Sequence, residues 1–305
     1  MANQNVHIAS ERQTLMNLMD TGTYAIPSRR VDENIMIATW NIQHFGSRHS
    51  ARAIQYIADI CERFDIIALQ EVKTNLLGLS RLLQKLPGNY KTLVTDPTGN
   101  NERFAFLYDK RTVIPTGLAC EVGFVVSKED HTAFQLHRMP YCVSFKSGRF
   151  DFVIVSNHIY FGKGKGKKFR KVEIEALVEF IHGRSTKERE KVFDRDFFIV
   201  GDFNIPDPKS EYFDALVAKG FEMPKGMDSL GTNFDGTKTY DKIAWVPRDS
   251  FTFTGKFNTV PFGEVLFKEN GSRGAKKEIS DHRPLWAEFA INKLTQELDQ
   301  IISQG

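Results

Sequence analysis

Cysteine is scarce in this chain of 305 residues. The three cysteines, Cys61, Cys120 and Cys142, stand far apart, and no Cys-x-x-Cys pair occurs among them. An odd, sparse set of this kind argues against a disulfide framework and against a cysteine-based zinc site. Reduced thiols in this number are typical of the cytosol, so we expect a cytoplasmic protein.

Long apolar runs are also lacking. No segment approaches the roughly 18 apolar residues that are needed to span a bilayer. The N-terminus has no basic stretch followed by an apolar segment, the pattern of a signal peptide. We therefore expect a monomer that has no membrane partner.

The chain also lacks a large excess of positive or negative charge. The chain has 41 Lys and Arg residues against 38 Asp and Glu residues, a formal net charge of +3. This balance neither requires nor excludes a polyanionic partner, so the local distribution of charge decides. Apolar residues make up 41% of the chain, enough for a real core. The 25 phenylalanines fall mainly in strand-like runs and are expected to fill that core.

Strand-like and helical segments alternate from residue 34 onward. Apolar runs at 34–40 and 65–70 are each followed by helical spacing, at 52–64 and 76–86, which indicates helices packed on a sheet. The same reasoning predicts further strands at 103–108, 120–127, 141–146, 150–157, 196–200, 242–246 and 285–290, a hairpin at 251–267, and helices at 11–19, 172–182, 210–219 and 291–302.

No repeat, long linker or low-complexity block interrupts this alternation. One α/β domain with two sheets is the simplest account of it. We expect that domain at 34–291, after an N-terminal extension at 1–33 and before a C-terminal helical tail at 292–305.

Polar residues follow several of the expected strands. They are Asn41, Glu71, Asn157-His158, Asp202, Asn204 and Asp281-His282. One Asp or Asn after a strand is usually a turn residue, but a set restricted to Asn, Glu, Asp and His is typical of a hard-cation site. Such ligands suit Mg²⁺, with Mn²⁺ as the alternative. Zinc is disfavoured because no cysteine joins the set and the two histidines lack a metal-binding spacing.

Most of these residues lie in four short blocks that span about 250 residues in order. The blocks are Thr39-Trp40-Asn41-Ile42, Leu69-Gln70-Glu71-Val72, Gly201-Asp202-Phe203-Asn204 and Ser280-Asp281-His282-Arg283-Pro284. They resemble the ordered signature blocks of the endonuclease/exonuclease/phosphatase superfamily. The resemblance implies a four-layered α/β sandwich, two mixed β-sheets flanked by helices, with the site at the sheet edges.

Other segments are similar to the deoxyribonuclease I-like branch of that superfamily. They are Asn101-Glu102-Arg103 before an aromatic strand, Arg138-Met139-Pro140-Tyr141, Asn157-His158 and Tyr240-Asp241-Lys242-Ile243. The resemblance implies two carboxylate–histidine pairs, Glu102 with His158 and Asp241 with His282. A carboxylate fixes the tautomer of its histidine and makes it a better base, while the imidazolium form can donate to phosphate.

We expect Glu71 to be the chief metal carboxylate, assisted by Asn41 and Asp281. The expected catalytic residues are His158, His282, Asp202, Glu102, Asp241 and Asn204. The expected phosphate-binding residues are Arg138, Asn204, Lys73, Lys165 and Lys167. Which histidine acts as acid and which as base is left open.

Two positions depart from the deoxyribonuclease I pattern. Lys73 stands where an Arg reaches the DNA minor groove, and Asn100 stands where a Tyr packs on a sugar. Lys keeps the charge but loses the planar fork, so these changes leave phosphate chemistry intact and weaken the prediction of groove binding. Basic, Gly-rich segments at 163–171 and 271–277 are expected to contact the nucleic-acid backbone, with solvated loops as the alternative.

We therefore expect an Mg²⁺-dependent phosphodiesterase, specifically an endonuclease that hydrolyses DNA. The first alternative is a phosphatase or phospholipase of the same superfamily that acts on a small-molecule or lipid phosphoester. The second is a catalytically dead binding module, which is disfavoured because all the expected polar positions are filled.

Overall fold

The apolar run that begins at Asn34 forms strand β1 (Asn34–Phe45), which is buried along nearly its whole length. Burial on both faces is typical of a central strand that has a parallel neighbour. β1 pairs in parallel with β2 (Ile66–Lys73) and antiparallel with β11 (Leu285–Ala290). In this computed structural model, all residues are described except 1, 124–134, 163, 187–195, 293–301 and 303–305.

Two mixed sheets form the centre of the described structure. The six-stranded sheet has the order β10-β11-β1-β2-β4-β3, and its remaining strands are β3 (Tyr90–Val94), β4 (Glu102–Asp109) and β10 (Thr252–Thr259). The five-stranded sheet has the order β5-β6-β7-β8-β9, with β5 (Ile114–Glu121), β6 (Tyr141–Ser147), β7 (Phe150–His158), β8 (Phe197–Asp202) and β9 (Asp241–Trp245). The parallel pairs are β1–β2 and β7–β8.

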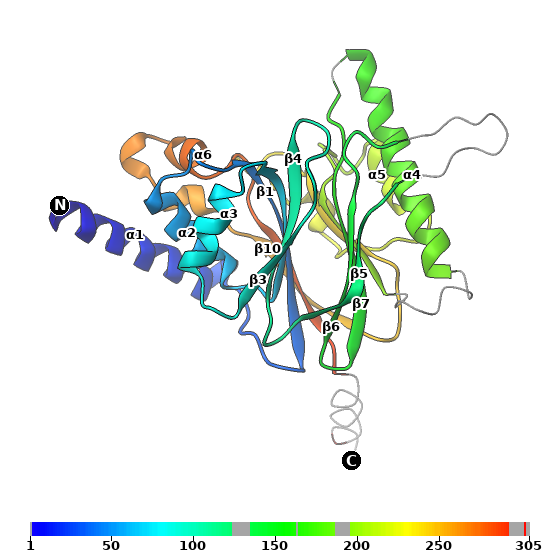
Figure 1. Ribbon diagram of the computed structural model, residues 1–305, viewed down its shortest axis with the longest axis horizontal. Helices are drawn as coiled ribbons and strands as arrows, with labels where there is room; N and C mark the ends of the chain where they lie inside the picture. Colours follow the sequence, from blue (N-terminus) through cyan, green and yellow to red (C-terminus); the bar gives the residue numbers. More distant parts are fainter. Residues whose placement is uncertain (1, 124–134, 163, 187–195, 293–301, 303–305) are drawn as a thin grey trace.

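Helices cover the outer face of each sheet (Figure 1). On the six-stranded sheet these are α1 (Ala2–Asp20), α2 (Ala51–Cys61), α3 (Leu77–Lys85) and α6 (Gly274–Glu278); on the five-stranded sheet they are α4 (Lys167–Thr186) and α5 (Glu211–Val217). Short 3-10 helices lie at Gly22–Tyr24, Gly164–Gly166, Met227–Ser229, Phe262–Glu264 and Lys268–Asn270. The expected four-layered α/β sandwich is confirmed.

Strand β7 shows how alternation along a strand builds these layers. Phe152 and Ile154 point into the apolar cluster between the two sheets. Val153 and Val155 point the other way, into the cluster beneath α4 and α5. Successive side chains of a strand face opposite sides, so one strand serves two cores. The phenylalanines do fill the space between the sheets, as expected, and they surround Phe198.

Several expected elements differ in the structure. The prediction of a hairpin at 251–267 is wrong. β10 is one strand that pairs with β11. Gly255 (φ +85°) lies at a register shift within β10 and not at a hairpin turn. The strand expected at 120–127 instead runs over Ile114–Glu121, and 124–127 lie outside the described residues. Strand β3 was not expected. The C-terminal helix expected at 291–302 falls almost wholly outside the described residues.

Helix α1 packs on the domain through both apolar and charged contacts. Leu15 and Met19 are fully buried in the cluster on the outer face of the six-stranded sheet. The buried Glu11 carboxylate accepts hydrogen bonds from the Tyr56 hydroxyl, the Arg52 guanidinium and, at 2.7 Å, the backbone N–H of Phe267. Much of the segment before β1 therefore belongs to the packed structure.

His49 is buried where α2 begins, and its surroundings suit the neutral ring. Its Nδ1 lies 3.5 Å from the backbone N–H of Gly46, and its Nε2 lies 3.1 Å from the carbonyl oxygen of Ile279. A ring that carries its proton on Nε2 satisfies both contacts. Burial, reinforced by the neighbouring Arg48 charge, lowers the pKa of His49 to about 4.

We expect acidification to destabilise the fold through His49. The unfolded chain binds this proton near pH 6.5 and the folded chain only near pH 4, so the free energy of unfolding falls across that window. The loss is roughly 2–3 kcal/mol. Urea denaturation from pH 7.5 to 4.5 measures it. His49→Gln should start less stable and lose less on acidification; equal losses in the two proteins would contradict this assignment.

Candidate active site

The polar residues at the ends of β1 and β2 meet those at the ends of β7 and β8. Within each sheet the parallel register sets Asn41 beside Gln70, and His158 beside Asp202. Between the sheets, the Asn41 side-chain amide donates to Asp202 Oδ2 at 3.0 Å. Parallel strands end at the same edge of a sheet, so two such edges form one site.

A buried hydrogen bond also joins the two sheets next to this site. The side-chain amide of Gln70, which is fully buried, donates to Ser156 Oγ at 3.1 Å. The same amide nitrogen lies 3.1 Å from Thr39 Oγ1 in its own sheet. A buried amide needs such partners, because leaving it unpaired costs about 1–3 kcal/mol.

Glu71 projects into the site from an irregular position in β2. Its backbone is left-handed, with φ +60°, where the pairing of β2 with β4 shifts register. Its Oε1 accepts from the Asn41 amide at 3.1 Å, and its Oε2 accepts from the backbone N–H of His44 at 3.0 Å. A left-handed conformation in a residue with a Cβ costs energy and is common at functional sites.

Asp202 lies between the two predicted histidines. Its Oδ2 is 3.5 Å from His158 Nε2 and 3.8 Å from His282 Nε2. His282 Nδ1 is hydrogen-bonded to Asp241 Oδ2 at 2.7 Å, as the expected carboxylate–histidine pair requires. Both imidazoles therefore present Nε2 to the same carboxylate oxygen.

The electrostatics of these groups separate the two histidines. Burial lowers the pKa of His158 well below its usual value, and the Arg138 charge lowers it further. For His282 burial acts in the same direction, but the Asp241 and Asp202 carboxylates outweigh it and raise the pKa to about 10. Burial raises the pKa of Asp202 to about 6, against the opposing charge of His282. Near neutral pH, His282 is charged and His158 is not.

Glu102 lies beside His158 but is held by two cations. Its Oε2 is 3.2 Å from Arg138 Nε, and its Oε1 is 3.4 Å from Lys73 Nζ. The distance from Oε2 to His158 Nδ1 is 3.9 Å, longer than a hydrogen bond. Among the described residues, His158 Nδ1 has no hydrogen-bond partner. Glu102 and His158 are therefore neighbours, but Glu102 pairs with Arg138 and Lys73 and not with His158.

Asn204 is held against Asp202 by a buried arginine that the sequence reasoning missed. The backbone N–H of Asn204 donates to Asp202 Oδ1 at 2.8 Å, and its backbone is left-handed with φ +53°. Arg170, 3% exposed, donates to the Asn204 carbonyl oxygen at 2.7 Å. Arg170 lies in the basic stretch at 163–171, where nothing in the sequence separates a buried Arg from exposed Lys residues.

The remaining predicted residues are less closely tied to this cluster. Asp281 is half-buried, and its negative charge helps to raise the pKa of His282. Lys167 is exposed at the first residue of α4 and forms no hydrogen bond or ion pair within the described part of the chain. The Lys165 side chain is not described. The basic segments are partly helical, because 163–171 includes the start of α4 and 271–277 runs into α6.

His44 was also missed, although it contacts two of the predicted carboxylates. Its Nδ1 is 3.2 Å from Glu71 Oε2 and 3.8 Å from Glu102 Oε1. It follows Asn41 by three residues, and only the backbone bend at Gln43 and His44 (φ +27° and +53°) brings it to Glu71. Because this bend cannot be read from residue type or spacing, the sequence offered no reason to choose His44 as a site residue.

The donor set of the site fits a divalent cation. One group consists of His44, Glu71 and Glu102, and another of Asp202, Asp241 and His282; in each group the candidate ligand atoms lie within 4.8 Å of one another. Carboxylate and amide oxygens predominate, as hard divalent cations prefer. Glu71 is well placed to hold such an ion because its side chain is 14% exposed at the surface of the site.

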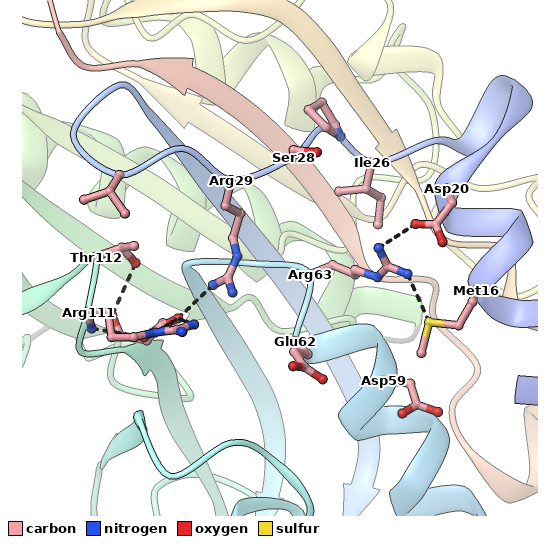
Figure 2. Close-up of a pocket in the computed structure, with 13 residues that line it drawn as sticks. Met16, Asp20, Ile26, Ser28, Arg29, Asp59, Glu62, Arg63, Arg111 and Thr112 are labelled. Carbon is pink, nitrogen blue, oxygen red and sulfur yellow. Dashed lines mark hydrogen bonds and ion pairs between the residues drawn. The ribbon is translucent and has the colours of Figure 1, made fainter. Parts of the chain in front are cut away.

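A pocket of about 690 Å³ elsewhere in the molecule has different chemistry (Figure 2). It contains ion pairs of its own, Arg63 with Asp20 at 2.6 Å and Arg29 with Asp109 at 3.1 Å. Asp109 and Glu102 are at opposite ends of β4, about 24 Å apart at the usual rise per residue. This pocket is therefore separate from the candidate active site.

Two mixed sheets flanked by helices, with carboxylates and imidazoles gathered at one edge, are the arrangement expected of a phosphoesterase. The chain belongs to the endonuclease/exonuclease/phosphatase family, whose profile matches residues 38–282. It is thus an enzyme of that superfamily. Within the described residues, no helix has the length and apolar character to cross a membrane.

Sequence similarity relates part of the chain to deoxyribonucleases. Human deoxyribonuclease-1 is 36% identical over 85 residues, which cover 25% of this chain and 30% of that protein. The bovine protein is 35% identical over 95 residues, which cover 27% of this chain and 34% of that protein. The similarity thus spans about a third of these relatives' length.

Solved structures share the fold over most of the chain. Truncated TDP2 from Caenorhabditis elegans superposes with a TM-score of 0.58 at 16% identity, covering 84% of this chain and 97% of that one. The mannosyl-6-phosphatase of Bacteroides thetaiotaomicron gives 0.56 at 19% identity, with 84% and 99% covered. The human nocturnin catalytic domain with bound sulfate gives 0.57 at 14%, with 85% and 95% covered.

Proposed function

We propose that this chain is a divalent-metal-dependent endonuclease that hydrolyses phosphodiester bonds in DNA. The observation that carries the proposal is the position of Asp202 Oδ2 between the Nε2 atoms of His158 and His282, next to Glu71 and Asn41. Phosphodiester hydrolysis needs a base for water, a donor to the phosphate and a neutralising charge. These residue types supply all three.

The residues take distinct roles in this proposal. His282, hydrogen-bonded to Asp241, is the charged imidazole and donates to a phosphate oxygen. His158 is the neutral imidazole and, together with Asp202, takes the proton of the attacking water. Arg138 adds positive charge beside them. A cation bound at Glu71, with Asn41 and Asp281 assisting, would neutralise charge on the phosphate and stabilise the leaving oxygen.

Two observations favour DNA over a small phosphoester. A segment of the chain is 35–36% identical to mammalian deoxyribonuclease-1. Lys73 and Arg138 place two cations at the site, and in this proposal Lys73, Lys165 and Lys167 contact the phosphate backbone. The fold shared with the mannosyl-6-phosphatase supports the alternative function, a phosphatase. Plasmid nicking distinguishes the nuclease from the phosphatase. We propose a cytoplasmic location and a monomer on the sequence evidence alone.

The test is nicking of supercoiled plasmid. With Mg²⁺ or Mn²⁺ we expect conversion to open circles and then to linear DNA; EDTA should abolish it. Glu71→Gln should lower the rate at least about 100-fold, because it removes the carboxylate charge that holds the cation. His7→Gln, on α1, is the matched control and should leave the rate unchanged. Release of phosphate from mannose 6-phosphate without plasmid nicking would contradict the nuclease proposal and favour the phosphatase.

A further inference from the structure

His44 approaches the carboxylate site with two of its nitrogen atoms. Its backbone N–H donates to Glu71 Oε2 at 3.0 Å, and its side-chain Nδ1 lies 3.2 Å from that same oxygen. Nδ1 is also 3.8 Å from Glu102 Oε1. The imidazole therefore faces one oxygen of each of two carboxylates.

The backbone holds His44 in this position by a bend inside β1. Gln43 and His44 both have positive φ, at +27° and +53°, and the pairing of β1 with β2 shifts between Asn41 and Phe45. Two consecutive left-handed residues with Cβ atoms cost energy and persist only where the surroundings hold them. Arg48 does so by donating to the Gln43 carbonyl oxygen at 2.6 Å.

His44 Nδ1 and Glu71 Oε2 have nearly the spacing of two ligands around one ion. Ligand atoms about 2.1 Å from an ion in adjacent positions lie roughly 3 Å apart. The distance from His44 Nδ1 to Glu71 Oε2, 3.2 Å, needs only a small contraction to match. The His44 side chain is 56% exposed, so it can move that far without disturbing the core.

We propose that His44 supplies an imidazole ligand to the cation at Glu71, and that this ligand makes the site select Mn²⁺ over Mg²⁺. The inference rests on the proposed function, since the cation is the one that the nuclease would use. Imidazole nitrogen binds first-row transition ions well and Mg²⁺ poorly, whereas carboxylate oxygen accepts both. A site of carboxylates and amides alone would lack this selectivity.

The test measures metal binding directly and separately from DNA cleavage. Calorimetric titration with Mn²⁺ and with Mg²⁺ compares the wild type with His44→Gln. We expect the variant to bind Mn²⁺ at least about tenfold more weakly and Mg²⁺ nearly as before. His182→Gln is the matched control, because His182 lies on α4 and belongs to none of the candidate metal-binding groups among the described residues. It should leave both affinities unchanged.

A spectroscopic readout distinguishes a ligand from a nearby ion pair. Pulsed electron paramagnetic resonance of bound Mn²⁺, in protein labelled with ¹⁵N-histidine, should show a nitrogen coupling that disappears in His44→Gln. A coupling that persists in the variant, or an equal loss of Mn²⁺ and Mg²⁺ affinity, would overturn the assignment. If the coupling behaves as expected and plasmid DNA is not cut, the nuclease proposal fails and the role of His44 as a ligand is upheld.

Discussion

Replacement of His282 by Gln is expected to lower kcat for DNA hydrolysis by about 10²- to 10⁴-fold. The imidazole is charged because Asp241 and Asp202 lie 2.7 and 3.8 Å from its two nitrogens. Glutamine can still donate a hydrogen bond, but it carries no charge and cannot transfer a proton at neutral pH. Single-turnover rates on an oligonucleotide duplex, with the cation saturating, measure the loss in the chemical step.

Two controls separate a catalytic loss from unfolding or weak binding. His7→Gln should leave kcat unchanged, and the dissociation constant of His282→Gln for DNA in Ca²⁺ should stay within a few-fold of the wild type. A His282→Gln protein that is folded and cuts DNA at the wild-type rate would disprove the catalytic role of this residue.

The largest expected effect on stability comes from Phe198→Ala. Phe198 is fully buried between the sheets, and its ring centroid lies 5.0 Å from those of Phe251 and Phe289. Removing a ring from such a site leaves a cavity as well as losing apolar burial, which costs about 3–5 kcal/mol. Urea denaturation at pH 7.5 should show this decrease in the free energy of unfolding.

Phe169→Ala is the matched control for that measurement. Phe169 is 50% exposed on α4, so its removal should change stability by less than about 0.5 kcal/mol. A similar change in both variants would mean that the cluster between the sheets does not dominate the stability of the fold.

Much of the fold could be predicted from the sequence because the strands that carry the site are strongly patterned. The runs beginning at Asn34 and Ile66 are continuous apolar segments, which is typical of central strands. β10 could not be predicted in the same way, because Gly255 has the same sequence signature whether it makes a hairpin turn or a bulge. β3 is five residues long and only partly buried, so its pattern is weak.

Part of the candidate site could likewise be predicted from the sequence, and part could not. Asp202 and Asp241 lie at paired strand ends, where the order of strands brings them together, and His282 lies three residues before β11. His44 and Arg170 reach the site through a bend in β1 and through burial of one side of α4. Neither feature leaves a mark in residue type or spacing. The hydrogen bonding of Glu102 to Arg138 and not to His158 likewise depends on sub-ångström placement.

The hydrogen bond from Gln70 to Ser156 has a consequence for the spacing of the whole active site. The apolar contact between phenylalanine rings depends little on direction. The two sheets could therefore slide over one another and still bury a similar apolar area. A buried polar pair depends strongly on position, since sliding the sheets breaks the hydrogen bond from Gln70 to Ser156 while both side chains stay shielded from water. Together with the hydrogen bond from Asn41 to Asp202, this contact therefore favours one alignment of the sheets, and with it the separation of Glu71 from Asp202, which come from different sheets.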